Sequence, residues 1–167
     1  MDKKLTEFER LFQESESDPT NIEQKKYGRD MDVDDYNYTF QDVEISLDDL
    51  NEKNQKAIYK KNGLQDKRFH ALKKLKSKSL PHAMIDLHAQ PSTIQGLKTL
   101  NNFFKDNYHK HQYFKIIHGK GLHNNKEISP MRNLVRKFLL NNPEVLAFTP
   151  AQNNDGGDGV TYVLIKK

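Results

Sequence analysis

The amino-acid sequence predicts an α/β fold over residues 81–167, a two-layer sandwich whose elements follow the order β-α-β-α-β-β. Four short apolar segments bounded by Gly, Pro or Asn are typical of strands. Two longer segments between them carry apolar residues at helical spacing, and each follows a helix-start signal. Elements in this order can pack as helices against a sheet, and the stretch is long enough for one such domain.

The four strands are expected where apolar residues run together. They are, in chain order, AMIDLH (83–88), YFKIIHG (113–119), VLAFTP (145–150) and VTYVLIKK (160–167). The polar stretch QNNDGGDG (152–159) before the last strand is expected to be a turn. Such a turn needs positive φ angles, which glycine adopts without strain.

The two helices begin at recognisable signals. Pro91, Ser92 and Thr93 open the first helix, and Ser129 followed by Pro130 opens the second. A proline is tolerated in the first helical position because its missing N–H would have no partner there. The expected core-facing residues are Ile94, Leu97, Leu100 and Phe104 in the first helix, and Met131, Leu134, Val135, Phe138 and Leu139 in the second.

Residues 1–80 are expected to be an N-terminal extension that is largely disordered or helical. Its acidic arm, residues 1–45, has too few aliphatic side chains to offset the entropy of ordering, apart from a short helix near its start. Residues 46–80 form a helical and basic segment. Within it, residues 46–62 are predicted to be a helix, and residues 66–78 form an amphipathic stretch with seven basic side chains, counting one His. That stretch either is attracted to a nucleic acid or a ribosome or is a plain linker helix.

The net charge of +4 is unevenly distributed along the chain. Residues 1–50 carry a net charge of −9, residues 51–80 carry +8 and residues 81–167 carry +5. An acidic arm followed by a basic remainder suggests a polyanion partner for the basic part, although an ordinary solvated surface would show the same charges.

Composition also excludes several kinds of site. The chain has no Cys, which excludes disulfides, a thiolate zinc site and a Cys nucleophile, and which fits a reducing compartment. No apolar run is long enough to span a membrane, and the first residues, MDKKLTEFER, lack the apolar stretch of a signal peptide. We therefore expect a cytoplasmic protein without a membrane partner.

The first candidate site lies at the end of the first strand. Asp86 and His88 are two residues apart, so their side chains point to the same side of the sheet. Ligands of open α/β sheets bind where strands end in this way. An Asp can orient a His ring, stabilise its cation or share a metal with it. Alternatively, the His is merely hydrogen-bonded.

A second candidate follows the second strand, at His118-Gly119-Lys120-Gly121. The two glycines let backbone N–H groups approach an anion, and Lys120 adds a positive charge. The helix that begins near Pro130 offers its N-terminus as a further anion site, with Arg132 in its first turn. This is not a Walker loop, because the longer glycine spacing and the Lys-Ser/Thr pair are missing. The alternative is a tight loop with a solvated lysine.

The third candidate is the run Gly156-Gly157-Asp158-Gly159. A hairpin turn is the usual meaning of such a run before an alternating strand. Three glycines exceed what a hairpin needs, which indicates close approach of the backbone to a ligand or to a neighbouring loop.

Together these motifs resemble the Smr domain, the small MutS-related domain. IDLHA (85–89), IHGKG (117–121), a helix, VLAFTPA (145–151) and GGDGVTYVLI (156–165) follow the family's order of a D-L-H-G motif, an H-G-K/R-G motif and a G-G-x-G turn. The resemblance covers residues 83–167. It implies a fold like that of the C-terminal domain of translation initiation factor three. It also implies nicking of DNA or endonucleolytic cleavage of RNA. Some stand-alone bacterial members carry an N-terminal extension and rescue collided ribosomes by cutting mRNA.

Two positions depart from the family pattern. Ala89 replaces the usual Gly of the first motif, and Val160 replaces the common small residue after the glycine turn. The Asp and His of the first motif and the His, Gly and Lys of the second are kept, which favours an active member.

We therefore predict an endonuclease. The expected catalytic residues are Asp86, His88, His118 and Lys120, and the expected phosphate-binding residues are Gly119, Gly121, Arg132, Gly156, Gly157 and Gly159. His88 would act as base or acid, and His118 would sit across the scissile phosphate or help to bind it. Lys120 and the amides of Gly119 and Gly121 would stabilise charge on the phosphoryl oxygens.

RNA is the expected substrate, because attack by a 2′-OH needs no metal and no cluster of carboxylates near the motifs would hold Mg²⁺ well. No cofactor and no metal ligand are therefore expected, although cleavage of DNA would suit a divalent ion held by Asp86. The partners would be RNA or DNA and, on an mRNA substrate, the ribosome. Two alternatives remain open: a non-catalytic module that binds nucleic acid or the ribosome, and a protein-interaction domain that docks through residues 66–78.

Overall fold

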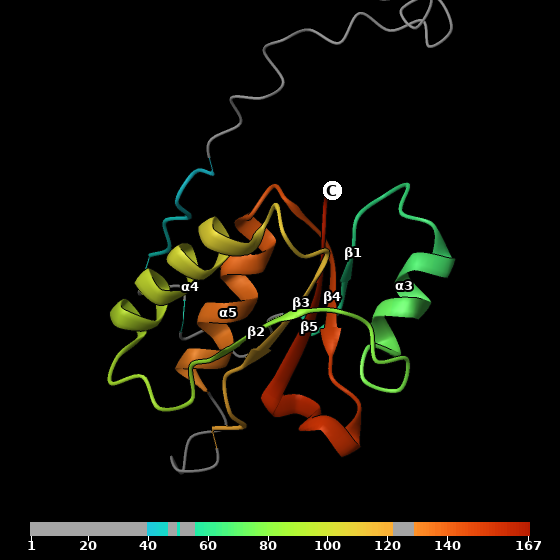
Figure 1. Cartoon of the computed structure of the whole chain (residues 1–167). Helices are drawn as coiled ribbons and strands as arrows, with labels where there is room; N and C mark the ends of the chain where they lie inside the picture. The colour runs from blue at the N-terminus through green and yellow to red at the C-terminus, as the bar shows by residue number, and fades with distance from the viewer. Residues whose placement is uncertain (1–39, 47–49, 51–55, 122–128) are drawn as a thin grey trace, which may run out of the picture. The chain divides into compact units, whose positions relative to one another are not determined.

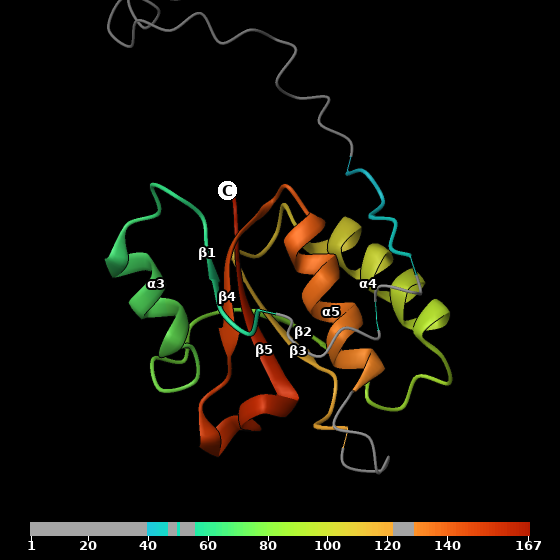
Figure 2. The same ribbon diagram turned by 180° about the vertical axis from the view of Figure 1, so that it is seen from behind.

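The computed structural model describes residues 40–46, 50, 56–121 and 129–167. Residues Phe40–Lys167 form one compact unit. Its centre is a five-stranded sheet with the strand order β1-β4-β5-β3-β2. Helices α4 and α5 cover one face of this sheet and α3 packs on the other, as the two opposite views show (Figures 1 and 2).

The sheet is mixed. Its strands are β1 (Tyr59–Lys60), β2 (Ala83–Asp86), β3 (Tyr113–Ile117), β4 (Val145–Pro150) and β5 (Val160–Ile165). β2 and β3 are parallel neighbours, whereas β5 pairs antiparallel with both β3 and β4, and β1 pairs antiparallel with β4. Since β2 and β3 run the same way, with Asp86 opposite Ile117, the first two motifs leave the sheet at the same edge.

The helices begin where the sequence predicts. α4 spans Thr93–Asn107 and α5 spans Pro130–Asn141. Ser92 caps α4, since its hydroxyl accepts a hydrogen bond from the Gln95 N–H at 3.2 Å. Ser129 caps α5 and Pro130 takes the first helical position. The predicted fold class and the order of its six C-terminal elements are therefore confirmed.

The core between the sheet and α4–α5 is rich in aromatic rings. Phe104 of α4 lies edge-to-face against Phe114 of β3 and Phe138 of α5, with ring centroids 4.9 Å apart in both pairs. All three side chains are fully buried. Each such ring stabilises the fold by about 1.5–3 kcal/mol through burial, and edge-to-face contact adds to this. This packing holds α4 and α5 against each other and against the sheet.

The basic stretch 66–78 is helical in its first part, where α3 spans Asp66–Lys73. Its interleaved apolar residues fill a core of their own. Leu72 and Leu75 are fully buried against β4 and β5 on the face opposite α4 and α5. This helix thus adds a third layer to the two predicted for residues 81–167.

The helix predicted over residues 46–62 is wrong where the structure describes that segment. Tyr59–Lys60 is a strand that pairs with Phe148 and Ala147 of β4. The Tyr59 ring stacks on that of Phe148, with centroids 5.7 Å apart. Pairing with a strand almost ninety residues away outweighs a local pattern that suits a helix equally well. Residues 47–49 and 51–55 lie outside the described residues, as do residues 1–39 of the predicted acidic arm with its short helix.

Residues 40–46, at the end of the predicted arm, pack against α4. Val43 is buried, and its backbone forms both hydrogen bonds of a reciprocal pair with the Asn101 side chain. The Val43 N–H donates to Asn101 Oδ1 at 2.9 Å, and Asn101 Nδ2 donates to the Val43 carbonyl at 3.1 Å. The buried Asn101 side chain thereby satisfies the Val43 N–H and carbonyl, as a neighbouring strand would do in a sheet.

Asn101→Ala is expected to lower the free energy of unfolding by about 1–3 kcal/mol, because it leaves the Val43 N–H and carbonyl without partners in a buried place. Urea unfolding followed by far-UV circular dichroism measures the change. Asn102→Ala, at the exposed neighbouring position, is the control and should change stability by no more than about 0.5 kcal/mol. Equal effects of the two substitutions would show that the pair with Val43 adds nothing.

Candidate active site

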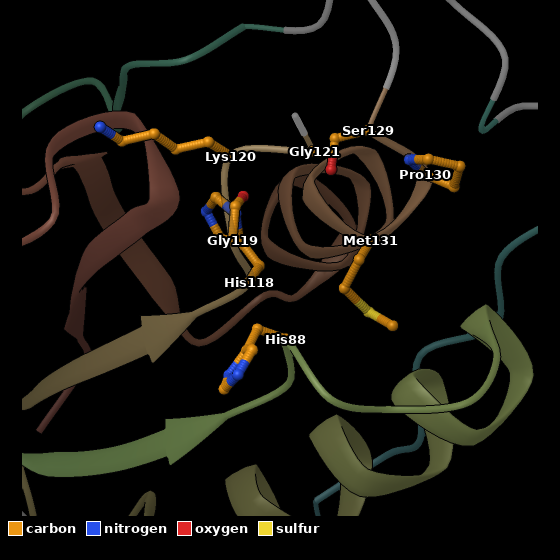
Figure 3. A pocket seen from close by; sticks show the side chains of 8 residues that line it. All are labelled: His88, His118, Gly119, Lys120, Gly121, Ser129, Pro130 and Met131. Carbon is orange, nitrogen blue, oxygen red and sulfur yellow. The ribbon is translucent and has the colours of Figure 1, made fainter. Parts of the chain in front are cut away.

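A pocket of about 390 Å³ opens where β2, β3 and α5 meet. Its lining residues come from the end of the first motif, the second motif and the start of α5 (Figure 3). They are His88, His118, Gly119, Lys120, Gly121, Ser129, Pro130 and Met131. The structure therefore brings the first two predicted motifs together at one site.

Asp86 and His88 form a hydrogen-bonded pair at the rim of this pocket. Asp86 Oδ1 accepts from the His88 backbone N–H at 2.9 Å and lies 2.5 Å from His88 Nδ1. A carboxylate only accepts, so Nδ1 carries the proton and Nε2 of the neutral ring presents its lone pair away from Asp86. The His88 side chain is 60% exposed, so this nitrogen is open to a substrate.

The charge of Asp86 is stabilised by the same contacts. Partial burial would raise the pKa of Asp86, but the hydrogen bonds from the His88 amide and ring outweigh it and hold that pKa below its ordinary value. Asp86 therefore stays ionised at neutral pH, where it fixes the tautomer of His88 and would stabilise its cation.

His118, by contrast, is buried and has both ring nitrogens engaged. Its Nδ1 donates to the Gly119 carbonyl at 3.0 Å, and its Nε2 accepts from the Thr161 hydroxyl at 2.9 Å. Burial, and then the charges of Arg136 and Arg132, lower the pKa of His118 to about 4. The ring is thus neutral at pH 7 and offers no free nitrogen to a substrate. The catalytic role predicted for His118 stays a prediction, and these contacts argue for a role in holding the loop.

The loop after β3 is held in place by hydrogen bonds to the glycine turn, residues 152–159. The N–H groups of His118 and Gly119 both donate to the Gly159 carbonyl at 3.0 Å. The Gly119 amide, which was predicted to bind a phosphate, therefore already donates to a carbonyl of the protein. Within the part of the chain that the structure describes, the N–H groups of Lys120 and Gly121 have no acceptor. Both residues line the pocket.

Gly121 brings the loop against the start of α5. Its φ is +74°, and a Cβ there would lie 2.4 Å from the Ser129 Cβ. Ser129 Oγ accepts from the Arg132 N–H at 3.4 Å, and Pro130 has no N–H to offer. Ser129, Pro130 and Met131 line the pocket together with Lys120 and Gly121, so the positive end of the α5 dipole lies at this pocket, an arrangement that favours a bound anion.

The glycine turn consists of two short 3₁₀ helices, η3 (Asn153–Asp155) and η4 (Gly157–Gly159). The positive φ angles expected there occur at Gly156, with +102°, and Gly157, with +54°. Gly159 is a place of close approach, since a Cβ there would lie 3.1 Å from Lys120 Cγ. These glycines and Arg132 do not line the pocket; Gly159 supports its wall.

Three residues of the site were not singled out from sequence. Ser129 and Met131 were assigned to a helix cap and a core face, and both also line the pocket. Thr161, which holds His118, gave no signal beyond its place in an alternating strand. Among the described residues, the buried Nε of Arg132 has no hydrogen-bond partner, so the arginine expected to bind phosphate lies in the first turn of α5 with this donor unpaired there.

Among the described residues, no group of three or more His, Asp or Glu side chains is arranged to hold a metal ion. None of the described helices is long and apolar enough to cross a bilayer. The polar side chains that line the pocket are those of His88, His118, Lys120 and Ser129.

The buried neutral state of His118 predicts a loss of stability in acid. In the unfolded chain His118 takes up a proton near its ordinary pKa of 6.5, whereas the folded protein resists it down to about pH 4. The stabilisation is therefore complete above pH 6.5 and is lost as the pH falls toward 4, by at most about 3 kcal/mol. Urea unfolding at pH 7 and pH 4.5 measures it. In His118→Gln the drop between these pH values should be smaller, and an unchanged drop would contradict the assignment.

Comparison with known proteins agrees with this geometry. The family model described as the Smr domain matches residues 85–166. Among solved structures, the chain is similar to YdaL, a stand-alone small MutS-related protein from Escherichia coli, with a TM-score of 0.57 and 25% identity over 66% of this chain and 83% of that one. It also matches the Smr domain of Thermus thermophilus MutS2, with a TM-score of 0.44 and 22% identity over 51% of this chain and 99% of that one. No curated protein gave a significant match. Residues 85–166 of this chain are thus identified as an Smr domain, similar to that of a stand-alone small MutS-related protein.

Proposed function

We propose that this protein is an endonuclease that cuts RNA at the pocket beside Asp86 and His88. Smr domains are associated with endonuclease activity and nucleic-acid binding. The observation that carries the proposal is the Asp86–His88 pair. A carboxylate fixes the ring 2.5 Å away, so that the free ring nitrogen stands at the rim of an anion-binding pocket.

The scissile phosphate would be bound by backbone amides and one cation. The N–H groups of Lys120 and Gly121 have no acceptor in the described structure, and the start of α5 adds its positive dipole end. Lys120 is exposed and supplies a full charge. Donors fixed in advance around developing negative charge are the largest contribution to many enzymes' rates, with one such donor typically worth about 10²–10³ in rate.

On RNA, the neighbouring 2′-OH is the nucleophile. His88 Nε2 removes its proton, the 2′ oxygen bonds to phosphorus and the bond from phosphorus to the 5′ oxygen breaks. The leaving oxygen takes a proton from water at the open side of the pocket. The products are a 2′,3′-cyclic phosphate and a 5′-hydroxyl end. His88 keeps its Nδ1 proton throughout, hydrogen-bonded to Asp86, and the Asp86 carboxylate stabilises the imidazolium that forms.

In this scheme His118 positions the loop and transfers no proton. Its pKa of about 4 and its bonds to Gly119 and Thr161 leave it neutral and occupied.

An mRNA on a ribosome is the finer form of this proposal. It is supported by the basic residues that α3 and the following turn expose beside the Smr domain. They are Lys67, Lys73, Lys74, Lys76 and Lys78. Binding of the full chain to ribosomes should weaken steeply with salt if such contacts form.

The test is a cleavage assay on end-labelled single-stranded RNA and on supercoiled DNA, each in EDTA and in Mg²⁺. Cleavage of RNA in EDTA supports the proposal. Nicking of DNA in Mg²⁺ alone would favour attack by water with a metal ion held through Asp86. Binding without cleavage of either substrate would make the domain a nucleic-acid-binding module.

A further inference from the structure

Asp155, which no motif includes, is a partly buried carboxylate with three donors. Its side chain is 11% exposed. Oδ1 accepts from Lys115 Nζ at 2.7 Å and lies 3.4 Å from Lys76 Nζ, and Oδ2 accepts from the Tyr162 hydroxyl at 2.5 Å. Lys76 also donates to the Asn154 carbonyl at 2.6 Å.

These donors come from three different parts of the fold. Lys115 lies in β3 and Tyr162 in β5, while Lys76 follows α3 and precedes the Smr domain. Partial burial would raise the pKa of Asp155, but the hydrogen bonds from Lys115 and Tyr162 outweigh it and lower that pKa. The carboxylate is thus ionised and well paired, and removal of one partner would leave a partly buried charge without compensation.

Asp155 fixes the position of the glycine turn. It ends η3, and the Gly157 N–H returns to the Gln152 carbonyl at 3.1 Å. The next part of the turn presents the Gly159 carbonyl, on which the N–H groups of His118 and Gly119 both converge. Contacts therefore run without a break from Lys76 and Asp155 through the turn to the loop that carries Lys120 and Gly121. Figure 1 shows the turn after α3 and the turn before β5 at the same end of the sheet.

We propose that Asp155 is a positioning residue for this site, and that Lys76 makes the segment before the Smr domain part of the same functional unit. The loop amides can bind a phosphate only where the Gly159 carbonyl holds the loop. Asp155 ties that carbonyl to the sheet, and Lys76 ties it to the α3 segment. The expected effect on cleavage rests on the proposed function. The contacts that connect Lys76 and Asp155 to the loop can be tested whether or not the protein cuts RNA.

Asp155→Asn keeps the shape of the side chain and removes its charge. Lys115 then faces no carboxylate, and the turn is held more weakly. A displacement of the order of 1 Å in a catalytic group can reduce turnover about 10²-fold, so kcat for RNA should fall by roughly this factor. KM should change little, because most of the RNA-binding surface is untouched. Lys76→Met should act in the same direction with a smaller loss, since Lys76 is half-exposed.

The experiment uses the full chain and two readouts, amide hydrogen exchange of His118 and Gly119 and steady-state cleavage of RNA. Asp106→Asn, at an exposed position of α4, is the charge-matched control. Asn101→Ala is the destabilised control, remote from the turn. The expected result is faster exchange of both amides in Asp155→Asn and Lys76→Met and in neither control, together with the loss of kcat.

Unchanged exchange in Asp155→Asn would overturn the inference, as would equal exchange in Asn101→Ala, which would mark a global effect. Faster exchange with unchanged kcat would overturn the positioning role. If the wild-type chain cuts no RNA, the proposed function fails separately, and exchange alone decides whether Asp155 and Lys76 hold the loop.

Discussion

Replacing His88 with alanine is expected to reduce RNA cleavage by a factor of about 10²–10⁴, the usual contribution of a positioned acid or base. The ring is 60% exposed, so its removal creates no cavity and the fold should remain intact. Single-turnover cleavage at saturating protein measures the chemical step, and circular dichroism checks the fold.

His70→Ala removes an exposed histidine from α3 and serves as the matched control. It should cleave at the wild-type rate. If His88→Ala cleaves RNA as fast as wild type, His88 does not take part in proton transfer, and the assignment of the site to this motif is wrong.

Gly121→Ala is expected to produce the second-largest loss, on the order of 10²-fold in cleavage rate, because it displaces the loop from the start of α5. Its φ of +74° disfavours any Cβ, and the new methyl group would lie 2.4 Å from the Ser129 Cβ. Either the loop or the cap of α5 must shift, and both line the phosphate pocket. Quenched time courses measure the cleavage rate. Protection of the Lys120 amide from hydrogen exchange by added phosphate measures whether the displaced loop still binds an anion.

Gly63→Ala separates the conformational effect from the steric one. Gly63 also has a positive φ, +82°, but a Cβ there meets nothing within 4 Å. Both variants carry the left-handed penalty of roughly 1–2 kcal/mol, so both should lose stability. Only Gly121→Ala should lose activity. A similar loss in Gly63→Ala, or full activity in Gly121→Ala, would contradict the role given to the contact with Ser129.

The parts of this structure that sequence predicts are those with local causes. The starts of α4 and α5 follow from Ser92 and from Ser129 with Pro130, because a cap acts within one turn of its helix. Asp86 and His88 are two residues apart on a strand, and their pairing needs no knowledge of the rest of the fold.

The parts that sequence reasoning missed depend on distant partners. β1 exists because β4 offers an edge to Tyr59 and Lys60. His118 resembles a catalytic histidine in its motif, and only the packing of Thr161 from β5 and of α5 shows that it is buried and occupied. Asp155 belongs to no motif, since its three partners are 7, 40 and 79 residues away.

The most direct test of the central claim uses one RNA whose cleavage position has been mapped with the wild-type chain in EDTA. A single 2′-deoxy substitution is then placed on the nucleotide that donates the attacking 2′-OH. The proposed mechanism predicts that cleavage at this position is abolished, while the unsubstituted RNA yields 2′,3′-cyclic phosphate and 5′-hydroxyl ends. Cleavage of the substituted RNA at the same position and rate would contradict it, because water and not the neighbouring hydroxyl would then be the nucleophile.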